Sequence, residues 1–164
     1  MLENERKEAG ERAVLVHITF RANQEELYEL KELAKSAGTE TVYVLTGSRQ
    51  KPDSKHFIGK GKLEELKAIV DSYEANVVLF NHALSPSQER NLETYLGVRV
   101  VDRNGLILDI FAQRAQSREG KIQVELAQLK YLLPRLVMGQ NSAFSRLAGG
   151  IGGRGPGETK LETD

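Results

Sequence analysis

Hydrophobic residues in the first part of the chain gather in four short runs, at positions 13–20, 41–45, 76–80 and 98–101. Each run is nearly continuous in apolar character, which is typical of strands that are covered on both faces. The segments between the runs carry apolar residues at helical spacing instead. This alternation predicts an α/β fold, β-α-β-α-β-α-β, with a four-stranded parallel sheet flanked by helices and right-handed crossovers. The pattern leaves the strand order open.

Capping residues indicate where the intervening helices begin. Asn23 is the predicted N-cap of the first helix, and the second helix is predicted over about 62–74. Ser85 with Pro86 and Gln88 predicts a capping box at the start of the third helix. The predicted inward-facing residues are Leu27, Leu30, Leu33, Ala34 and Ala37 in the first helix, and Leu63, Leu66, Ile69, Val70 and Tyr73 in the second.

From Asn104 onward the pattern is helical only. Five residues at alternating spacings of four and three form an apolar seam that needs a partner helix: Ile122, Leu126, Leu129, Leu133 and Leu136. The unpaired seam predicts self-association or folding back onto the α/β part. Pro134 is predicted to kink or locally break this helix.

A glycine-rich loop follows the seam, with six glycines among residues 149–157, and a new helical pattern begins just before the chain stops. The helical region from Asn104 onward is therefore predicted to be a long-helix hairpin. The glycine-rich loop is its tip, and its returning arm is cut off. The predicted organisation is an N-terminal tail (1–12), an α/β subdomain (13–103) and a helical subdomain (104–164).

Composition narrows the class of protein. The 164 residues include no cysteine, and the three histidines are too scattered for a local zinc pattern. The N-terminus is charged where a signal peptide is apolar, and no apolar run reaches the roughly 20 residues of a membrane span. These features favour a cytosolic protein that binds no metal.

The net charge is zero, but the charge is unevenly distributed. Residues 1–46 carry six basic and nine acidic side chains, whereas residues 111–157 carry seven basic and only two acidic ones. A second basic stretch, residues 49–62, is called the basic segment; it contains Arg49, Lys51, Lys55, Lys60 and Lys62 against Asp53 alone. Both stretches are equally consistent with a phosphate-contacting surface and with a solvated face.

Nucleotide-binding motifs are incomplete. Gly150, Gly152 and Gly155 match G-x-G-x-x-G, but they lie beyond the predicted sheet, where that fingerprint has no meaning. No phosphate loop is present, and 102–105 only imitates the D-x-x-G of a GTPase. No catalytic constellation is visible either. The isolated chain is therefore predicted to lack GTPase activity, since positioning of the phosphates supplies nearly all phosphoryl-transfer catalysis.

The carboxyl ends of the predicted strands carry polar residues that should converge. Open parallel sheets bind ligands at this edge, which makes Gly47, Ser48, Asn81 and His82 a candidate ligand crevice. His82 is interpreted as a hydrogen-bonded residue at a strand end in preference to a catalyst.

Four long stretches resemble one family. HFIGKGKLEEL (56–66), FNHALSPSQERNLE (80–93), VVDRNGLILDIFAQRAQSREGKIQVELAQL (100–129) and GGIGGRGPGETKLETD (149–164) closely resemble the N-terminal region of the HflX GTPases. The resemblance covers nearly the whole chain from about Gly10. Two positions depart from the expected pattern: Asn81, where aspartate is common, and Gly153, where a bulkier residue is common.

The resemblance implies a ribosome-binding region that precedes a GTPase domain. Members of the family associate with the large ribosomal subunit and help to split or rescue stalled ribosomes. GTP and magnesium would belong to the GTPase domain, which is absent from these residues and would be a further partner. The resemblance also implies a cytoplasmic location. The alternative is an ATP-binding α/β module that regulates the GTPase domain.

The hairpin is the part that the resemblance implies to contact ribosomal RNA. Small residues at a loop tip allow close approach to folded RNA, and arginine can pair with phosphate or stack on bases. The expected RNA-binding residues are Arg154, Arg146, Lys160, Gly152, Gly153, Gly155 and Gly157, followed by Arg114, Arg118 and Lys121. A disordered linker is the alternative interpretation of the glycine-rich loop.

Overall fold

The computed structural model describes residues 10–20, 24–140 and 142–143. Its elements are β1 (Arg12–Thr19), α2 (Gln24–Ser36), β2 (Glu40–Ser48), α3 (Lys60–Ser72), β3 (Val77–Phe80), α4 (Pro86–Leu96), β4 (Arg99–Val101), α5 (Arg103–Arg114) and α6 (Arg118–Val137). The predicted alternation of strands and helices is confirmed. None of the helices in the described part of the chain combines the length and the apolar character needed to cross a membrane.

The four strands form one parallel sheet in the order β2-β1-β3-β4. The α/β fold with a four-stranded parallel sheet is therefore confirmed, and the structure adds the strand order. The connection from β2 to β3 places β3 on the side of β1 opposite to β2, so the strand order changes direction at β1. In open α/β sheets, ligands bind beyond the carboxyl ends of the strands at such a reversal, which here lies between β1 and β3.

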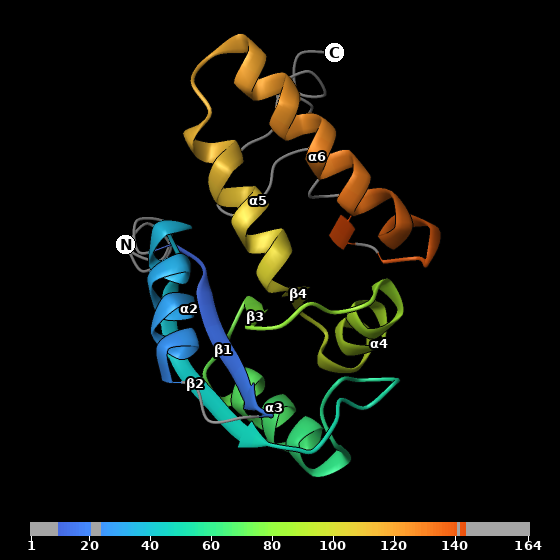
Figure 1. Cartoon of the computed structure of the whole chain (residues 1–164). Helices are drawn as coiled ribbons and strands as arrows, with labels where there is room; N and C mark the ends of the chain where they lie inside the picture. Colours follow the sequence, from blue (N-terminus) through green and yellow to red (C-terminus); the bar gives the residue numbers. More distant parts are fainter. Residues whose placement is uncertain (1–9, 21–23, 141, 144–164) are drawn as a thin grey trace.

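Each face of the sheet has its own apolar core. Val14, Val16 and Ile18 of β1 pack against α3 and α4, as do Phe80 and Val100 of the neighbouring strands. The alternate residues of β1 and β3 pack on the opposite face against α2 and α5: Ala13, Leu15, Val77 and Leu79. Figure 1 shows the sheet between these helices. Both faces are covered, which explains the continuous apolar runs in the sequence.

Local signals in the sequence placed the start of α4 correctly, whereas α3 spans Lys60–Ser72 instead of about 62–74. Ser85 accepts a hydrogen bond from the backbone N–H of Gln88, and the Gln88 side chain accepts one from Ser85 N–H, so the predicted capping box is confirmed. Asn23 lies outside the described residues. The prediction that Tyr73 faces inward is wrong. It follows the end of α3, is 40% exposed and packs against the Tyr43 ring.

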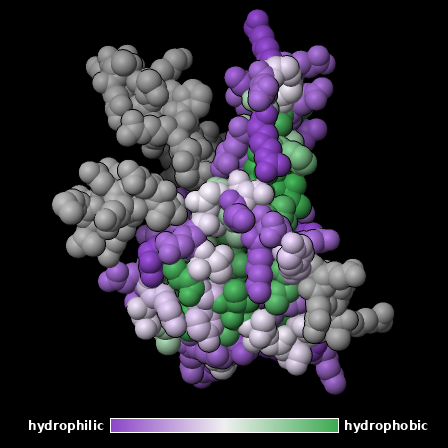
Figure 2. Space-filling model, turned by 90° about the vertical axis from the view of Figure 1, so that its left-hand side faces the viewer, coloured by the Kyte–Doolittle hydropathy of each residue, from purple (hydrophilic) through white to green (hydrophobic). Residues whose placement is uncertain are grey.

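Helices α5 and α6 form a hairpin whose turn is residues 115–117. Leu106 and Ile110 of α5 belong to the core beneath the sheet, whereas the far end of the hairpin projects away from the sheet (Figure 1). Figure 2 shows this projection as a largely hydrophilic column with apolar residues along part of one side. The hairpin predicted around residues 149–157 lies outside the described residues.

The structure of α6 bears on two expectations. Pro134 does not break the helix, which continues to Val137. A proline this close to the carboxyl end removes only one helical hydrogen bond and leaves the last turn intact. Of the two alternatives for the apolar seam, folding back onto the α/β part is not seen in the described residues, because Ile122, Leu126, Leu129 and Leu133 are 42–56% exposed. Self-association through the seam stays a prediction.

Candidate functional site

The sequence-predicted RNA-binding residues fall into two groups. Arg154, Arg146, Lys160, Gly152, Gly153, Gly155 and Gly157 lie outside the described residues. The other three, Arg114, Arg118 and Lys121, lie at the projecting end of the hairpin. Arg114 is the last residue of α5, and Arg118 is the first of α6.

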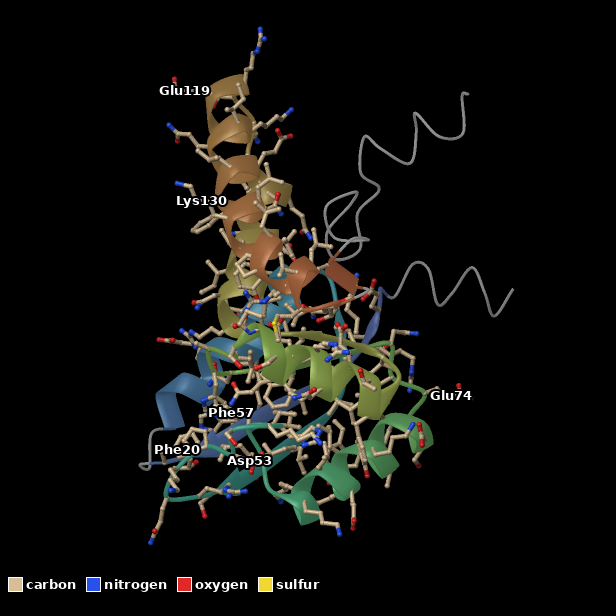
Figure 3. The ribbon with its side chains drawn as sticks, turned by 90° about the vertical axis from the view of Figure 1, so that its right-hand side faces the viewer. Phe20, Asp53, Phe57, Glu74, Glu119 and Lys130 are labelled. Atoms are coloured by element: carbon tan, nitrogen blue, oxygen red, sulfur yellow. The ribbon has the colours of Figure 1, made fainter. Side chains whose placement is uncertain are left out.

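The end of the hairpin is built by a local cap. Ser117 accepts a hydrogen bond from the backbone N–H of Gly120 at 2.9 Å, which begins α6 directly after the short turn. The basic side chains on either side are exposed, and Glu119 is the acidic residue among them. Glu119 marks this end in Figure 3. The arrangement places three cations at the point farthest from the sheet.

The basic segment lies at the other end of the molecule, between β2 and α3. Arg49, Lys51, Lys55 and Lys60 are exposed. Lys62 is partly buried and lies 3.2 Å from Glu65 in an ion pair. Its Cε also packs over Gly47, where a Cβ would approach it to 2.7 Å. The two predicted basic surfaces are therefore separate in space (Figure 3).

The predicted ligand crevice lies at the carboxyl edge of the sheet, near the reversal in strand order. Gly47 and Ser48 pair with Ile18 and Thr19 across β1 and β2. His82 follows β3, and its Nε2 accepts a hydrogen bond from the backbone N–H of Ile18 at 2.9 Å. The structure thus brings Gly47 and His82 to the same residue of β1 from opposite sides.

Side chains around His82 hydrogen-bond to one another. The Asn81 side-chain nitrogen lies 3.0 Å from Nδ1 of His17, and the His17 and His82 rings stack with centroids 5.6 Å apart. Arg103 donates to Asn81 Oδ1 at 2.7 Å and to Glu29 at 2.6 Å. These contacts join β1, α2, the end of β3 and the start of α5.

The pKa of His82 is lowered to about 4. Burial of the ring is the largest cause, and the neighbouring His17 and the Arg103 guanidinium lower it further. His82 is therefore neutral near pH 7, with Nε2 as an acceptor and the proton on Nδ1. The neutral His82 ring therefore links the end of β3 to β1, because its acceptor nitrogen, Nε2, is hydrogen-bonded to the backbone N–H of Ile18.

A buried polar cluster that the sequence did not reveal joins α6 to the α/β part. It consists of Glu89, Asp102, Tyr131 and Arg135 and is called the junction cluster. Glu89, Asp102 and Arg135 are 0%, 1% and 6% exposed. Arg135 Nε donates to Glu89 at 2.6 Å, and its Nη2 lies 3.5 Å from the Asp102 carboxylate.

The remaining groups of the junction cluster are also hydrogen-bonded. The Tyr131 hydroxyl contacts Asp102 and donates to Glu89 at 2.9 Å, while its ring lies 3.7 Å below the Arg135 guanidinium. Asp102 accepts from the backbone N–H groups of Gly105 and Leu84, which makes it the N-cap of α5. The cluster fixes the carboxyl-terminal half of α6 to α4 and to the start of α5.

Family models match most of the chain. Residues 24–112 match the family described as GTP-binding GTPase N-terminal, and residues 114–164 match the GTP-binding GTPase Middle Region. The two matches meet at residue 113, at the end of α5.

Curated relatives carry the name GTPase HflX. The chain is 57% identical over 162 residues to GTPase HflX of Escherichia coli strain K12, covering 98% of this chain and 38% of that protein. It is 58% identical over 155 residues to GTPase HflX of Caldanaerobacter subterraneus subsp. tengcongensis, covering 94% of this chain and 36% of that protein. The chain therefore spans little more than a third of these relatives.

Solved structures share the fold. A GTP-binding protein from the archaeon Sulfolobus solfataricus, in complex with GDP, superposes with a TM-score of 0.62 at 28% identity; the match covers 84% of this chain and 42% of that one. A G235S variant of SsGBP gives a TM-score of 0.65 at 30% identity, covering 77% of this chain and 40% of that one.

Proposed function

The chain belongs to the HflX GTPase family, as its N-terminal and middle regions, and we propose that it is the ribosome-binding region of such a GTPase. In this proposal the region contacts RNA of the large ribosomal subunit in the cytoplasm and helps to split or rescue stalled ribosomes. The GTP-hydrolysing domain, with its GTP and magnesium, lies outside these residues and acts as the partner of this region. In this proposal the chain alone is expected not to hydrolyse GTP, because it carries no phosphate loop.

The projecting hairpin is the observation that supports this proposal best. Arg114, Arg118 and Lys121 are exposed at the end farthest from the sheet, where they can reach a partner without interference from the α/β part. Basic side chains on a projecting element can contact phosphates, which supply most of the affinity for RNA. Arg154 and Arg146, in or beside the predicted glycine-rich loop, would add contacts that approach the RNA more closely.

Co-sedimentation with purified large ribosomal subunits at several salt concentrations tests the proposal in the full-length protein. Arg154→Ala should weaken binding and lower the salt slope by about one for one lost phosphate contact. Replacement of Arg114, Arg118 and Lys121 by alanine should lower the slope by about three. As a matched control, alanine at Lys31 and Lys35, which are exposed on α2, should leave binding unchanged.

Arg154→Lys separates charge from geometry. Lysine retains the positive charge but lacks the planar group that pairs bidentately or stacks. A loss as large as that of Arg154→Ala would indicate pairing or stacking. Equal affinity for large subunits in the wild type, both Arg154 variants and the variant of Arg114, Arg118 and Lys121 would contradict the proposed RNA binding.

The alternative function is an ATP-binding α/β module that regulates the GTPase domain. The position of Asn81 and His82 beside the strand-order reversal favours it, because nucleotides bind at such positions in open sheets. Against it stand the missing phosphate loop and the existing hydrogen bonds of these side chains: Asn81 bonds to His17 and Arg103, and His82 accepts from the backbone N–H of Ile18. Titration with a fluorescent ATP analogue tests this function directly. Saturable binding that His82→Gln abolishes would support it.

A further inference from the structure

The basic segment, residues 49–62, is held rigidly although it is mostly loop. Its centre is a tight turn in which Asp53 and Phe57 exchange two backbone hydrogen bonds of 2.9 and 3.0 Å. The Asp53 carboxylate accepts from the backbone N–H groups of Lys55 and His56, both at 2.9 Å. These bonds are the main cause of the lowered pKa of Asp53, so the carboxylate stays ionised and the turn stays closed near pH 7.

Two side chains of α4 attach this turn to the body of the protein. Gln88 donates to the backbone oxygen of Asp53 at 2.9 Å, and Asn91 donates to that of Lys55 at 3.1 Å. Phe57 anchors the turn from within, because it is only 5% exposed and packs edge-on against Phe20 and Phe80. The backbone that carries the basic side chains is therefore held by three sets of contacts: the hydrogen bonds within the turn, those from α4 and the packing of Phe57.

The outer surface of the basic segment carries charge of one sign. Arg49, Lys51, Lys55 and Lys60 are exposed, whereas its one carboxylate, that of Asp53, is directed at the backbone of its own turn. The Arg49 guanidinium packs over Gly59, where a Cβ would lie 2.3 Å from its Nη1. Burial is the largest cause of the lowered pKa of His56, so this residue adds no charge near pH 7.

The chemistry of the basic segment suits a phosphate backbone better than a protein surface. Its large apolar residues, Phe57 and Ile58, are both buried in the core. Protein interfaces are centred on exposed aromatic and large apolar side chains, and the segment exposes none; Pro52 is its exposed apolar residue. Contacts with RNA phosphates need cations at fixed positions and tolerate water.

We propose that the basic segment is a second RNA-contacting surface, which binds the phosphate backbone of the large ribosomal subunit. This inference rests on the proposed ribosome binding and extends it from one contact to two. The segment and the projecting end of the hairpin lie at opposite ends of the molecule, as Asp53 and Glu119 show in Figure 3. Two rigid, separated contacts fix the orientation of the protein on the subunit. Because the segment is already ordered, little conformational entropy is lost on binding.

The test compares three full-length proteins: the wild type, Lys51→Ala/Lys55→Ala and the control Lys31→Ala/Lys35→Ala. Each double variant removes two exposed lysines, so the net charge of the two variants is the same. The Lys51/Lys55 variant should bind large subunits on the order of tenfold more weakly near 0.1 M salt and lower the salt slope by about two. The control should match the wild type.

Binding to deproteinised RNA of the large subunit identifies the class of partner. The Lys51/Lys55 variant should show the same loss of slope on this RNA as on intact subunits. A loss on intact subunits alone would mean that the segment contacts a ribosomal protein, which overturns the inference. Unchanged affinity and slope on both would also overturn it. If the wild type itself does not bind subunits, the proposed ribosome binding is wrong. If the wild type binds and the Lys51/Lys55 variant binds equally well, only the inference about the basic segment is wrong.

Discussion

The α/β part and α6 differ in what they bury. In the sheet, the inward positions are filled by aliphatic and aromatic residues, and all four residues of β3 are buried. In α6, four leucine or isoleucine residues of the apolar seam are exposed, whereas the face that contacts the rest of the protein includes Leu132 and Arg135. The α/β part is thus held by apolar burial, and α6 is held largely by the polar junction cluster.

This difference bears on how the hairpin is presented. A buried ion pair contributes little net stability compared with apolar side chains of the same volume, but breaking it is costly. Hydrogen bonds and ion pairs also require defined angles, which apolar contacts do not. We infer that the junction cluster fixes the direction in which α6 leaves the sheet, while the exposed seam stays available to a partner.

The largest expected effect is the loss of Arg135. Arg135→Ala removes the guanidinium that pairs with Glu89 and Asp102, two carboxylates that are almost fully buried. The two carboxylates would then lack a counter-charge, and the free energy of unfolding should fall by about 3–5 kcal/mol. Urea denaturation measures this, with exposed Lys130→Ala as the control on the same helix. A loss below about 1 kcal/mol would show that the cluster does not hold α6.

A leucine in the core beneath the sheet and a leucine on the exposed seam should respond very differently to the same substitution. Leu106 is fully buried beneath the sheet, whereas Leu126 is 52% exposed. Leu106→Ala should lower the free energy of unfolding by about 2–5 kcal/mol through lost burial and the cavity left behind. Leu126→Ala should change it by no more than about 0.5 kcal/mol. Equal losses in urea denaturation would contradict the comparison.

His82 should make the α/β part sensitive to acid. Its pKa is about 4 in the folded protein and 6.5 in the unfolded chain, so the unfolded state binds more protons between these values. The stabilisation is complete above pH 6.5 and is lost as the pH falls towards 4. Because the ring is partly exposed and screened, we expect a loss of about 1–2 kcal/mol.

Denaturation at pH 7.5 and pH 5 measures the effect of His82. His82→Gln should reduce the difference between the two pH values, at the cost of some stability at pH 7.5. His56→Gln serves as the comparison: the pKa of His56 is lowered in the same direction, but the residue lies on the basic segment, and this variant should reduce the difference less than His82→Gln does. A wild-type protein that is equally stable at both pH values would exclude the assigned role.

Local signals allowed most of the fold to be predicted. Continuous apolar runs marked the strands because both faces of the sheet are covered, and Ser85, Pro86 and Gln88 marked the start of α4 because a cap depends on residues close in sequence. The strand order could not be predicted. It depends on the side of the sheet to which each crossover adds its strand, and a buried strand has the same apolar pattern in every position. Tyr73 was misplaced because α3 ends just before it.

The junction cluster could not be predicted for a different reason. Glu89 and Arg135 are 46 positions apart, and each resembles an ordinary charged residue on a helix surface. The apolar seam even indicated a different face of α6 as the one that meets a partner. Only one weak signal was available: Arg135 follows Tyr131 by one helical turn, so that a cation and an aromatic ring lie on the same face.

A change on the exposed seam should affect association much more than stability. Leu126→Gln/Leu133→Gln replaces two exposed leucines and keeps residues that favour helix, so the free energy of unfolding should change by less than about 1 kcal/mol. Association should change far more, because an apolar stripe on a helix is a contact surface for a second copy of this chain. Sedimentation equilibrium should show concentration-dependent association of the wild-type chain and a mainly monomeric double variant, with Lys130→Gln behaving as the wild type. A wild-type chain that stays monomeric at high concentration would contradict self-association through α6.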